Sequence, residues 1–355
     1  MNTENRQLKV LVCGTNFGRV YLKGLERSNK HKIAGIFSQG SEQSKKIAEE
    51  YNVPLITDMD KVDKNEFDMA CVVIRSTAVG GKGTEISKAL LKKGIHVIQE
   101  HPVHYRDIVE LLRCAKENNC IYQVNSFYPY IKNVHVFIEK SNKLLKKCSP
   151  IYIDAMCSTQ VLFPMISIIG KTLQGFHPWR LQLIETGEYN LPFKLLIGEI
   201  RGIPVVFKIQ NQLDPKDPDN NGFLLHKIML GTTEGSLCLD NSNGFVIWSP
   251  QMHVPHINGV LDMYGNNQFV GLPVSELAIG QQEITYVDVY NELWPDGIVQ
   301  ALNEFDECIA DNSKKSVMAQ RMLAVSEIWK ELTEIVGSPQ LIDTPERKGI
   351  RLVEI

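Results

Sequence analysis

Short apolar runs alternate with amphipathic segments through the first 125 residues, and this alternation limits the possible folds more than any other feature. The apolar runs, which are typical of buried strands, cover residues 8–13, 32–37, 69–74, 95–98 and 121–124. Helical patterns lie between them, for example at residues 83–93 and 106–118. Strands that alternate with helices form parallel sheets with right-handed crossovers. We therefore expect an α/β domain that binds its ligands at the carboxyl ends of the strands.

A glycine turn follows the first apolar run and precedes a helical pattern. The turn is Gly14-Thr15-Asn16-Phe17-Gly18, with the spacing G-x-x-x-G in place of the usual G-x-G-x-x-G. Glycines permit close approach of the backbone, and a helix N-terminus presents N–H groups to a pyrophosphate. These five residues are predicted to hold the pyrophosphate of a dinucleotide, and the alternative is a purely structural turn.

The end of the second apolar run indicates which dinucleotide binds. An NAD enzyme usually has an acidic residue there for the ribose 2′-hydroxyl, but no acid occurs before Glu42. Hydroxyls, N–H groups at a helix start and a lysine suit a 2′-phosphate. The residues expected around it are Ser38, Gln39, Gly40, Ser41, Ser44 and Lys45. The cofactor is therefore predicted to be NADPH, and the alternative is an ordinary polar loop with a helix cap.

Polar residues follow three further strands, at the edge where the nicotinamide would lie. They are Arg75-Ser76-Thr77, Glu100-His101-Pro102 and Asn125-Ser126-Phe127-Tyr128. A hydride-transfer enzyme needs a proton donor at this edge, and His101 and Tyr128 are the candidates. An unperturbed imidazole titrates near pH ~6.5 and a phenol near ~10, so the histidine is the easier source. The alternatives are a structural hydrogen bond for His101 and an aromatic wall for Tyr128.

Length and composition allow two domains and exclude several classes of partner. The chain has 355 residues, 43% of them apolar, and a net charge of −3, which implies neither nucleic acid nor an anionic membrane. The eight cysteines form no C-x-x-C pair, and no histidines have metal-ligand spacing, so we assign no metal. Without a signal peptide or a long apolar span, we expect a reduced cytoplasmic protein.

Beyond about residue 145 the alternation ends and strands dominate. They are predicted at residues 151–156, 181–186, 194–200, 205–210, 226–231, 236–239 and 245–248. Turn residues between them indicate hairpins and a large, mostly antiparallel open sheet, whose second face suggests a homodimer. We expect a solvated turn at residues 214–222 and a helical tail at 297–336. The predicted domains are a Rossmann NADP-binding domain at 1–130 and an α+β substrate-binding and dimerisation domain at 131–355.

These motifs together resemble a known family. The first 130 or so residues are similar to the Gfo/Idh/MocA superfamily of glucose-fructose oxidoreductase and inositol dehydrogenase, in which the fifth strand ends in Glu-Lys-Pro. Here His101 replaces the lysine, and this departure resembles the thiazolinyl imine reductases of yersiniabactin and pyochelin siderophore biosynthesis. The motifs that carry the resemblance are the glycine turn, the three strand ends, Leu213-Asp214-Pro215-Lys216-Asp217-Pro218-Asp219 and Leu225-His226-Lys227.

The resemblance implies an NADPH-dependent enzyme that reduces a thiazoline C=N bond to a thiazolidine. Its substrate would be held on the phosphopantetheine arm of a nonribosomal peptide synthetase carrier domain. The nicotinamide would lie near Ser76, Thr77 and Glu100, and its C4 would deliver hydride to the imine carbon. His101 or Tyr128 would protonate the nitrogen. A basic rim for the acidic carrier domain is expected at Lys143, Lys146 and Lys147.

One comparison within the superfamily argues against sugar oxidation. The sugar dehydrogenases of the superfamily carry an Asp-x-x-x-His motif that acts as the base. The corresponding segment here, residues 158–165, contains neither an acid nor a histidine. Two alternatives stay open beside the tethered-imine reductase. One is an oxidoreductase for a free sugar or cyclic imine, and the other is a non-catalytic NADP-binding regulator of a synthetase.

Overall fold

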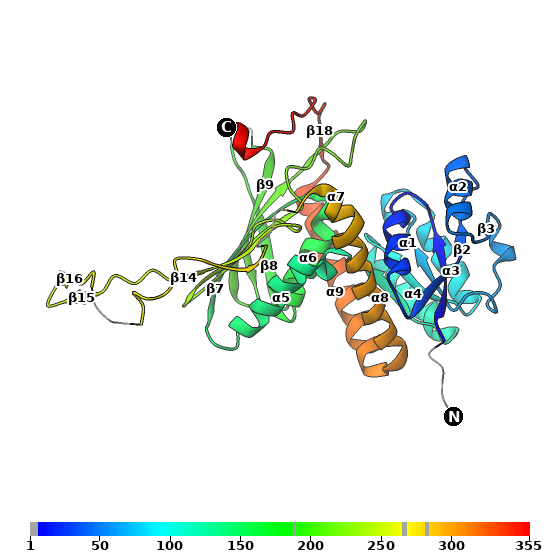
Figure 1. Ribbon diagram of the computed structural model, residues 1–355, viewed down its shortest axis with the longest axis horizontal. Helices are drawn as coiled ribbons and strands as arrows, with labels where there is room; N and C mark the ends of the chain where they lie inside the picture. Colours follow the sequence, from blue (N-terminus) through cyan, green and yellow to red (C-terminus); the bar gives the residue numbers. More distant parts are fainter. Residues whose placement is uncertain (1–5, 188, 190, 265–267, 281–283) are drawn as a thin grey trace.

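The computed structural model describes residues 6–187, 189, 191–264, 268–280 and 284–355. Two sheets stand at opposite sides of the molecule, and the helices α8 (Trp294–Ala310) and α9 (Asn312–Val336) lie between them (Figure 1). The N-terminal sheet is parallel and the C-terminal sheet is mostly antiparallel. The predicted α/β fold class is therefore confirmed.

The N-terminal sheet has the strand order β3-β2-β1-β4-β5-β6. Its strands are β1 (Leu8–Cys13), β2 (His31–Phe37), β3 (Leu55–Ile56), β4 (Met69–Val72), β5 (His96–Glu100) and β6 (Tyr122–Asn125). Its helices are α1 (Gly18–Glu26), α2 (Glu42–Glu50), α3 (Gly83–Lys92) and α4 (Tyr105–Glu117). This order is that of a Rossmann domain. The four residues of β4 are all buried, as expected for a parallel strand that is covered on both faces.

The C-terminal sheet has the strand order β17-β14-β13-β12-β7-β10-β9-β8. Its strands are β7 (Pro150–Ser158), β8 (Trp179–Ile184), β9 (Phe193–Ile200), β10 (Ile203–Gln210), β12 (His226–Thr232), β13 (Gly235–Leu239), β14 (Val246–Pro250) and β17 (Glu276–Ile279). Only β7 and β10 pair in parallel among these described strands. Arg201 and Gly202 form the β9–β10 hairpin with φ of 56° and 75°, as a type I′ turn requires.

The two faces of this sheet differ. The helices α5 (Lys132–Leu144) and α6 (Leu162–Leu173) cover one face, and the sequence did not predict either helix. Residues Ile153, Ala155 and Cys157 of β7 are buried toward these helices. The opposite face is exposed and carries apolar side chains such as Ile197 and Val206.

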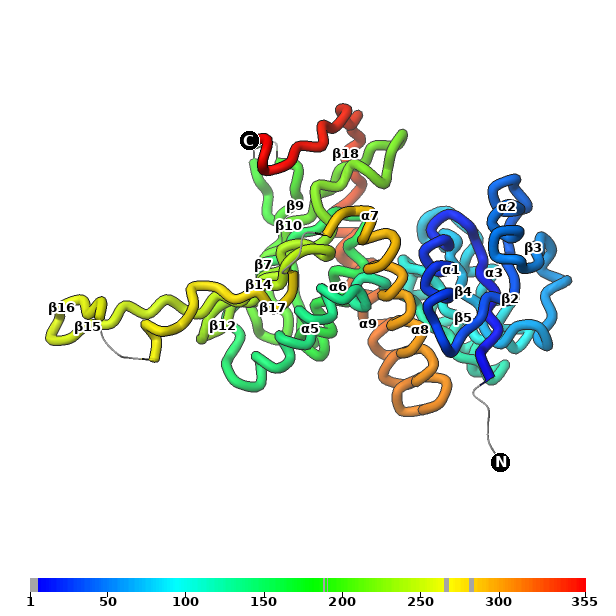
Figure 2. The backbone as a smooth tube through the Cα atoms, viewed as in Figure 1, coloured from blue at the N-terminus to red at the C-terminus, as the bar shows by residue number. Residues whose placement is uncertain are grey.

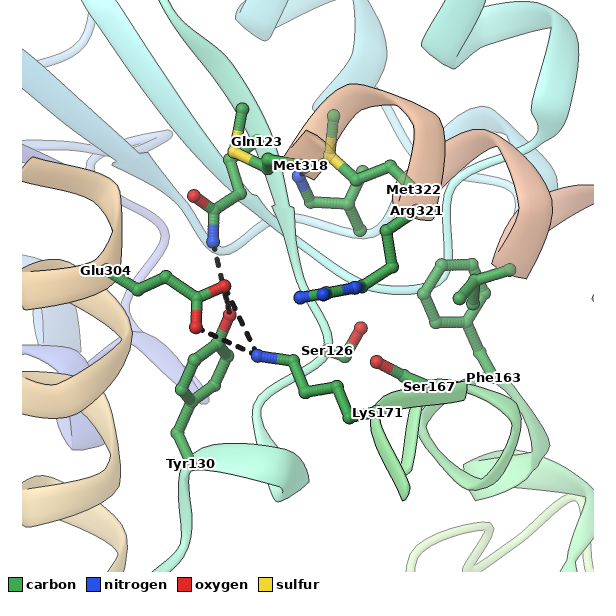
Figure 3. Close-up of a pocket in the computed structure, with 12 residues that line it drawn as sticks. Gln123, Ser126, Tyr130, Phe163, Ser167, Lys171, Glu304, Met318, Arg321 and Met322 are labelled. Atoms are coloured by element: carbon green, nitrogen blue, oxygen red, sulfur yellow. Dashed lines mark hydrogen bonds and ion pairs between the residues drawn. The ribbon is translucent and has the colours of Figure 1, made fainter. Parts of the chain in front are cut away.

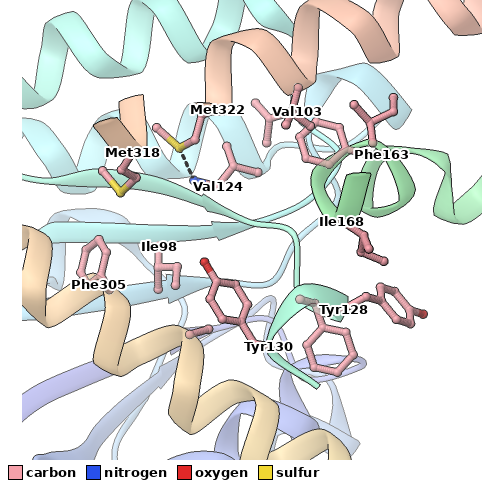
Figure 4. Packing of buried hydrophobic residues seen from close by; sticks show 14 of the residues in the cluster. Ile98, Val103, Val124, Tyr128, Tyr130, Phe163, Ile168, Phe305, Met318 and Met322 are labelled. Carbon is pink, nitrogen blue, oxygen red and sulfur yellow. Dashed lines mark hydrogen bonds between the residues drawn. The ribbon is translucent and has the colours of Figure 1, made fainter. Parts of the chain in front are cut away.

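The predicted helical tail consists of two helices that pack across both sheets. Asp311 ends α8 and caps α9, because its side chain accepts a hydrogen bond from the N–H of Ser313 at 2.8 Å. On the Rossmann side, Met322 of α9 accepts a hydrogen bond from the N–H of Val124 in β6 at 2.9 Å (Figure 4). On the other side, α9 contacts α6. The domain boundary between residues 130 and 131 stays a prediction. The helices α8 and α9 follow this boundary in the sequence but contact elements on both sides of it.

The loop at residues 214–222 is exposed at residues 215–217 and 219–220, as expected for a solvated turn, but its first acid is not. Asp214 is buried, and its carboxylate accepts hydrogen bonds from the N–H groups of Lys216 and Thr344. These bonds fasten the C-terminal segment beside the loop, where β11 (Gln212–Leu213) pairs with β18 (Gln340–Leu341). Composition indicated a loop correctly, but burial of its first acid depends on a segment about 130 residues away.

A long arm extends from the C-terminal sheet between β14 and β17 (Figure 2). Its outer part is a small hairpin of β15 (His256–Ile257) and β16 (Val260–Leu261). Several of its apolar side chains, including Met252, Tyr264 and Val274, are almost fully exposed. A two-stranded hairpin is at best marginally stable in water by itself. Among the helices of the described ranges, none is long and apolar enough to cross a membrane.

Gly24 allows α1 to contact α8, and its replacement by alanine should weaken this contact. A β-carbon at Gly24 would lie 2.8 Å from Cβ of Ile298 and 2.9 Å from the carbonyl oxygen of Pro295. Alanine adds about 1 kcal/mol of helix propensity, whereas overpacking costs about 1–3 kcal/mol. We expect Gly24→Ala to lower the free energy of unfolding in urea by about 1–2 kcal/mol.

Gly297→Ala is the matched control, because its β-carbon would lie at an ordinary 3.5 Å from Ile131. This variant should be neutral or more stable by up to about 1 kcal/mol. Equal effects of the two substitutions would contradict the proposed close packing of α1 on α8.

Candidate active site

His101 directly follows β5, at the edge of the Rossmann sheet where ligands bind. Its Nδ1 lies 2.8 Å from Oε1 of Glu100 and 3.1 Å from the carbonyl oxygen of Asn125 in the neighbouring strand β6. The side chain is only 9% exposed, and the peptide bond to Pro102 is cis. The structure therefore brings the predicted donor His101 and the strand-end residue Glu100 into direct contact.

A tyrosine from α1 holds Glu100 from behind. The hydroxyl of Tyr21 donates a hydrogen bond to Oε2 of Glu100 and accepts one from the side-chain amide of Asn125 at 2.6 Å. Tyr21 and Asn125 are both fully buried. Burial, together with the charge of Glu100, raises the pKa of Tyr21 well above its ordinary value, so this hydroxyl remains a donor.

A strained turn after β6 places Tyr128. Phe127 has φ 56° and ψ −67°, and the N–H of Tyr128 donates to the carbonyl oxygen of Ser126 at 2.7 Å, which defines a γ-turn. Such a conformation costs about 1–3 kcal/mol in a residue other than glycine. Burial of the Phe127 ring and a 2.8 Å hydrogen bond from its N–H to Oδ1 of Asn125 stabilise it. The turn leaves the Tyr128 ring 6.3 Å from that of His101.

Aromatic rings from three parts of the chain surround these groups. Phe163 of α6 stacks on His101, with 5.7 Å between ring centroids and an interplanar angle of 22°. Trp294, at the start of α8, contacts Phe127 at 5.4 Å and Phe17 of the glycine turn at 5.9 Å. The sequence did not indicate Phe163 or Trp294, because their elements lie far from the Rossmann strands in the chain.

His226 is a further residue that sequence reasoning missed. It lies in β12, is fully buried, and its ring centroid is 4.7 Å from that of Tyr128. Its Nε2 donates to the carbonyl oxygen of Val161 at 2.9 Å, and Nδ1 accepts from the hydroxyl of Ser242 at 2.8 Å. Burial lowers the pKa of His226 to about 3, so the ring is neutral. His226 is part of Leu225-His226-Lys227, one of the motifs that carry the family resemblance. Nothing in the spacing of this motif indicated a contact with Tyr128.

The glycine turn has the geometry that a bound pyrophosphate needs. Gly14 has φ 96°, and a β-carbon there would lie 2.6 Å from the carbonyl oxygen of Val73. The helix α1 begins at Gly18 without a side-chain cap and without an acid in its first turn. Its first N–H groups are therefore free of side-chain partners and can bind an anion. Thr15 and Asn16 line this turn, whereas the ring of Phe17 packs on Trp294.

The residues after β2 form the start of α2. Ser41 caps this helix by accepting a hydrogen bond from the N–H of Ser44 at 3.2 Å, and the hydroxyl of Ser38 accepts one from the N–H of Gly40 at 3.1 Å. Gln39, Ser41 and Lys45 are exposed, and Lys45 pairs with Glu42 at 2.6 Å.

Ser44 differs from the other residues in this set, because its side chain is fully buried. Its hydroxyl donates to the carbonyl oxygen of Ser41 at 2.8 Å, so it orders the helix start and does not face solvent.

The residues after β4 connect the loops of the predicted nicotinamide site. The hydroxyl of the buried Ser76 donates to the carbonyl oxygen of Pro102 at 2.6 Å, which holds the His101–Pro102 loop in place. The hydroxyl of Thr77 donates to the carboxylate of Asp107. Arg75 is exposed, and its carbonyl oxygen accepts from the N–H of Gly83 at 2.8 Å. Both predicted hydroxyls are therefore already hydrogen-bonded within the protein.

A small polar cavity lies behind the site, between α6, α8 and α9 (Figure 3). Lys171 pairs with Glu304 at 2.8 Å, and the hydroxyl of Tyr130 donates to Glu304 at 2.9 Å. Burial lowers the pKa of Lys171, although Glu304 opposes this change. The volume of about 30 Å³ has room for one or two waters and not for a substrate.

In the described part of the chain, no three histidine, cysteine or acidic side chains gather as metal ligands.

Comparisons with known proteins agree with this architecture. Residues 8–126 match the model of the Gfo/Idh/MocA oxidoreductase family with an NAD-binding Rossmann fold. Residues 148–249 match the model described as thiazolinyl imine reductase Irp3-like, C-terminal. No curated protein matches the sequence.

Three similar solved structures show the same fold over nearly the whole chain. The MviM dehydrogenase from Clostridium difficile is 14% identical, with 93% of this chain and 99% of that chain covered and a TM-score of 0.65. An oxidoreductase from Agrobacterium radiobacter in complex with NAD+, L-tartaric acid and magnesium is 9% identical, with 93% and 96% covered and a TM-score of 0.65. The 3-ketoreductase KijD10 from Actinomadura kijaniata, in complex with TDP-benzene and NADP, is 12% identical, with 96% and 100% covered and a TM-score of 0.65.

The Rossmann sheet and the match of residues 8–126 to an NAD-binding oxidoreductase family define an oxidoreductase with a dinucleotide-binding fold. Residues 8–126 are similar to the Gfo/Idh/MocA oxidoreductase family and residues 148–249 to the thiazolinyl imine reductase Irp3-like C-terminal type, each over less than half of the chain. The predicted family resemblance is confirmed within these two ranges.

Protonation of His226 should make the protein less stable in acid. The pKa of His226 is about 3 in the folded protein, against about 6.5 in an unfolded chain. Between these values the unfolded state binds a proton that the folded state does not, so the free energy of unfolding falls as the pH falls. This histidine should remove about 2 kcal/mol between pH 7.5 and pH 5.

Denaturant unfolding of His226→Gln at both pH values measures this contribution, because glutamine can keep both hydrogen bonds without titrating. The difference between the two pH values should be about 2 kcal/mol smaller in the variant than in the wild type. The exposed His256→Gln should keep the wild-type difference. An unchanged difference in His226→Gln would show that His226 does not resist protonation.

Proposed function

We propose that the protein reduces a thiazoline C=N bond to a thiazolidine with NADPH, on an intermediate held by a nonribosomal peptide synthetase carrier domain. The observation that carries this proposal is the imidazole of His101 at the carboxyl end of β5, enclosed by aromatic rings and joined to an Irp3-like domain. When bound, the reduced nicotinamide supplies a hydride to the imine carbon. The protein must then supply one proton to the nitrogen.

The start of α6 offers no base for the opposite reaction, oxidation of a hydroxyl group. The segment at residues 158–165 ends β7 and begins α6, and it presents the ring of Phe163 to His101. His226 lies beside this segment, but its Nε2 already donates to Val161 and its Nδ1 accepts from Ser242. Neither this segment nor His226 can therefore accept a proton from a substrate hydroxyl. Reduction needs one proton donor, and we propose His101 for this role.

His101 is the better of the two predicted donors. Burial raises the pKa of Tyr128 well above its ordinary value, and the charge of Glu100 raises it further. A phenol with a raised pKa is a weaker acid, so Tyr128 serves as an aromatic wall that packs on the substrate ring. His101 then gives its proton to the ring nitrogen. We therefore propose His101 as the proton donor.

The start of α2 supports the choice of NADPH over NADH. Ser41 and Lys45 are exposed there, and no acid ends β2. The start of a helix favours a bound anion. Glu42 neutralises part of the charge of Lys45 in the free protein, and a phosphate would compete for this lysine. We therefore propose that Ser38, Ser41 and Lys45 contact the 2′-phosphate.

Two partners are part of the proposal. A second copy of the chain would cover the apolar outer face of the C-terminal sheet, where Ile197 and Val206 are exposed.

The carrier domain would dock on basic residues, and the predicted Lys143, Lys146 and Lys147 are exposed at the end of α5. The thirteen residues of α5 separate them from Tyr130 by about 20 Å. A substrate delivered from there must travel on a flexible arm of at least that length.

Consumption of NADPH with a 2-hydroxyphenyl-thiazoline substrate tests the function. We expect oxidation of NADPH with the substrate loaded on a carrier domain, and with a free mimic at high concentration. His101→Ala should lower kcat by about 10²–10⁴-fold with little change in the affinity for NADPH, and Tyr128→Phe should lower it less. Turnover of free sugars but not of the imine would contradict the proposal. Tight NADPH binding without any turnover would favour the regulatory alternative.

The preference for NADPH is tested by Ser41→Asp combined with Lys45→Ala. Aspartate can keep the helix cap of Ser41, so the fold of α2 should persist. Its charge repels a 2′-phosphate and can accept from a ribose 2′-hydroxyl. The ratio of kcat/KM for NADPH to that for NADH should fall by at least about 10²-fold, as loss of a charged hydrogen-bonded contact implies. An unchanged ratio would show that the phosphate does not bind at α2.

A further inference from the structure

We propose that Glu100 is a positioning residue that fixes the proton of His101 on Nδ1, so that Nε2 is the nitrogen that gives a proton to the substrate. The inference rests on the proposed function for its substrate. It changes the role of Glu100, which the sequence indicated only as a contact of the nicotinamide.

The contacts of Nδ1 determine the tautomer. The two atoms within hydrogen-bond distance are Oε1 of Glu100 at 2.8 Å and the carbonyl oxygen of Asn125 at 3.1 Å. A carboxylate and a carbonyl oxygen only accept hydrogen bonds. Nδ1 must therefore carry a hydrogen in both the neutral and the protonated ring. In the neutral ring Nε2 then has the lone pair, and in the protonated ring Nε2–H is the acid.

Four residues form a closed set of polar contacts around this arrangement. Nδ1 of His101 donates to the backbone carbonyl of Asn125 and lies 2.8 Å from Oε1 of Glu100, the side chain of Asn125 donates to Tyr21, and Tyr21 donates to Glu100. Asn125 thus takes part twice, through its carbonyl oxygen and through its amide. Tyr21 comes from α1, while the other three residues come from the ends of β5 and β6. Because these contacts join three elements, the imidazole cannot rotate without losing its hydrogen bond to Asn125 and its contact with Glu100.

The groups that face His101 favour Nε2 as the donor. Phe163 covers one face of the imidazole, and Tyr128 meets its edge with its own ring at 71°. His226 of β12 is neutral, and Glu100 carries the nearest negative charge. In the reaction, the N–H bond at Nε2 breaks and its electron pair stays on the imidazole. The proton forms the new N–H bond of the thiazolidine, while the nicotinamide supplies both electrons as hydride.

Two roles for Glu100 lead to different kinetics. A residue that positions the proton donor affects kcat and leaves KM for NADPH nearly unchanged. A residue that only binds the cofactor affects KM for NADPH and leaves kcat nearly unchanged.

Glu100→Gln separates these roles, because glutamine keeps the size of the side chain but has no charge. We expect kcat to fall by about tenfold, because the proton of His101 is no longer held on Nδ1 beside a carboxylate. KM for NADPH should change less than about twofold. A raised KM with an unchanged kcat would overturn the proposal, as would wild-type values for both.

Tyr21→Phe is the second variant, because it removes one bond to Glu100 without removing a charge. It should lower kcat less than Glu100→Gln and leave KM for NADPH unchanged. Tyr122→Phe is its matched control. Tyr122 is an equally buried tyrosine in β6, and its hydroxyl donates to Gln99 and not to Glu100. It should keep the wild-type kcat, and an equal loss in both variants would assign the effect of Tyr21 to packing.

Nitrogen NMR of protein labelled with ¹⁵N-histidine tests the tautomer without any substrate. The spectrum of His101→Gln identifies the resonances of His101 by their absence. We expect a protonated Nδ1 and an unprotonated Nε2 in the neutral ring of the wild type. In Glu100→Ala only the carbonyl oxygen of Asn125 remains beside Nδ1, and a measurable fraction of the other tautomer should appear. A protonated Nε2 would overturn the proposal. Failure of the wild type to turn over the imine would refute the proposed function instead and leave this result unaffected.

Discussion

The close contact between α1 and α8 at Gly24 holds the two sheets in their relative positions. At one end of α8, Trp294 reaches the rings of Phe17 and Phe127. Farther along the helix, Asp306 accepts from the buried His31 of β2 at 3.1 Å. The partner helix α9 then lies between β6 and α6. Because of this packing, the strand ends of the Rossmann domain face α6 and β12 of the other domain at a fixed distance. The candidate site exists only where these elements meet.

Burial sets the chemistry of this meeting point. Aromatic rings exclude water from Tyr21, Tyr128 and His226, and the lower polarity shifts the pKa of each toward its neutral form. His101 and Glu100 are slightly more exposed, at 9% and 13%, than Tyr128 at 7%. Neutral groups therefore surround one pair that can carry charge. A site of this kind can exchange a single proton with a substrate.

The sequence predicted the parts of the site that depend on local order in the chain. Ligands bind at the carboxyl ends of parallel strands, and this rule placed His101, Tyr128 and the glycine turn at one edge of the sheet. It needs only the order of strands and turns along the chain. The rule could not show that the hydroxyls of Ser44 and Ser76 are already hydrogen-bonded, since their partners depend on loop geometry. Phe163 and His226 lie in another domain, and no local pattern relates them to His101. The helix α6 escaped prediction because nearly all its residues are buried, which removes the amphipathic pattern.

The ion pair of Lys171 and Glu304 has a consequence for motion. Its side chains are 15% and 34% exposed; it joins α6 of one domain to α8, and Tyr130 after β6 donates to the same carboxylate. A hinge movement that separated these helices would break the ion pair and this hydrogen bond, at a cost of about 1–3 kcal/mol. This cost favours the closed arrangement of the two domains, so a bulky substrate would enter with its reactive ring first and leave its remainder outside.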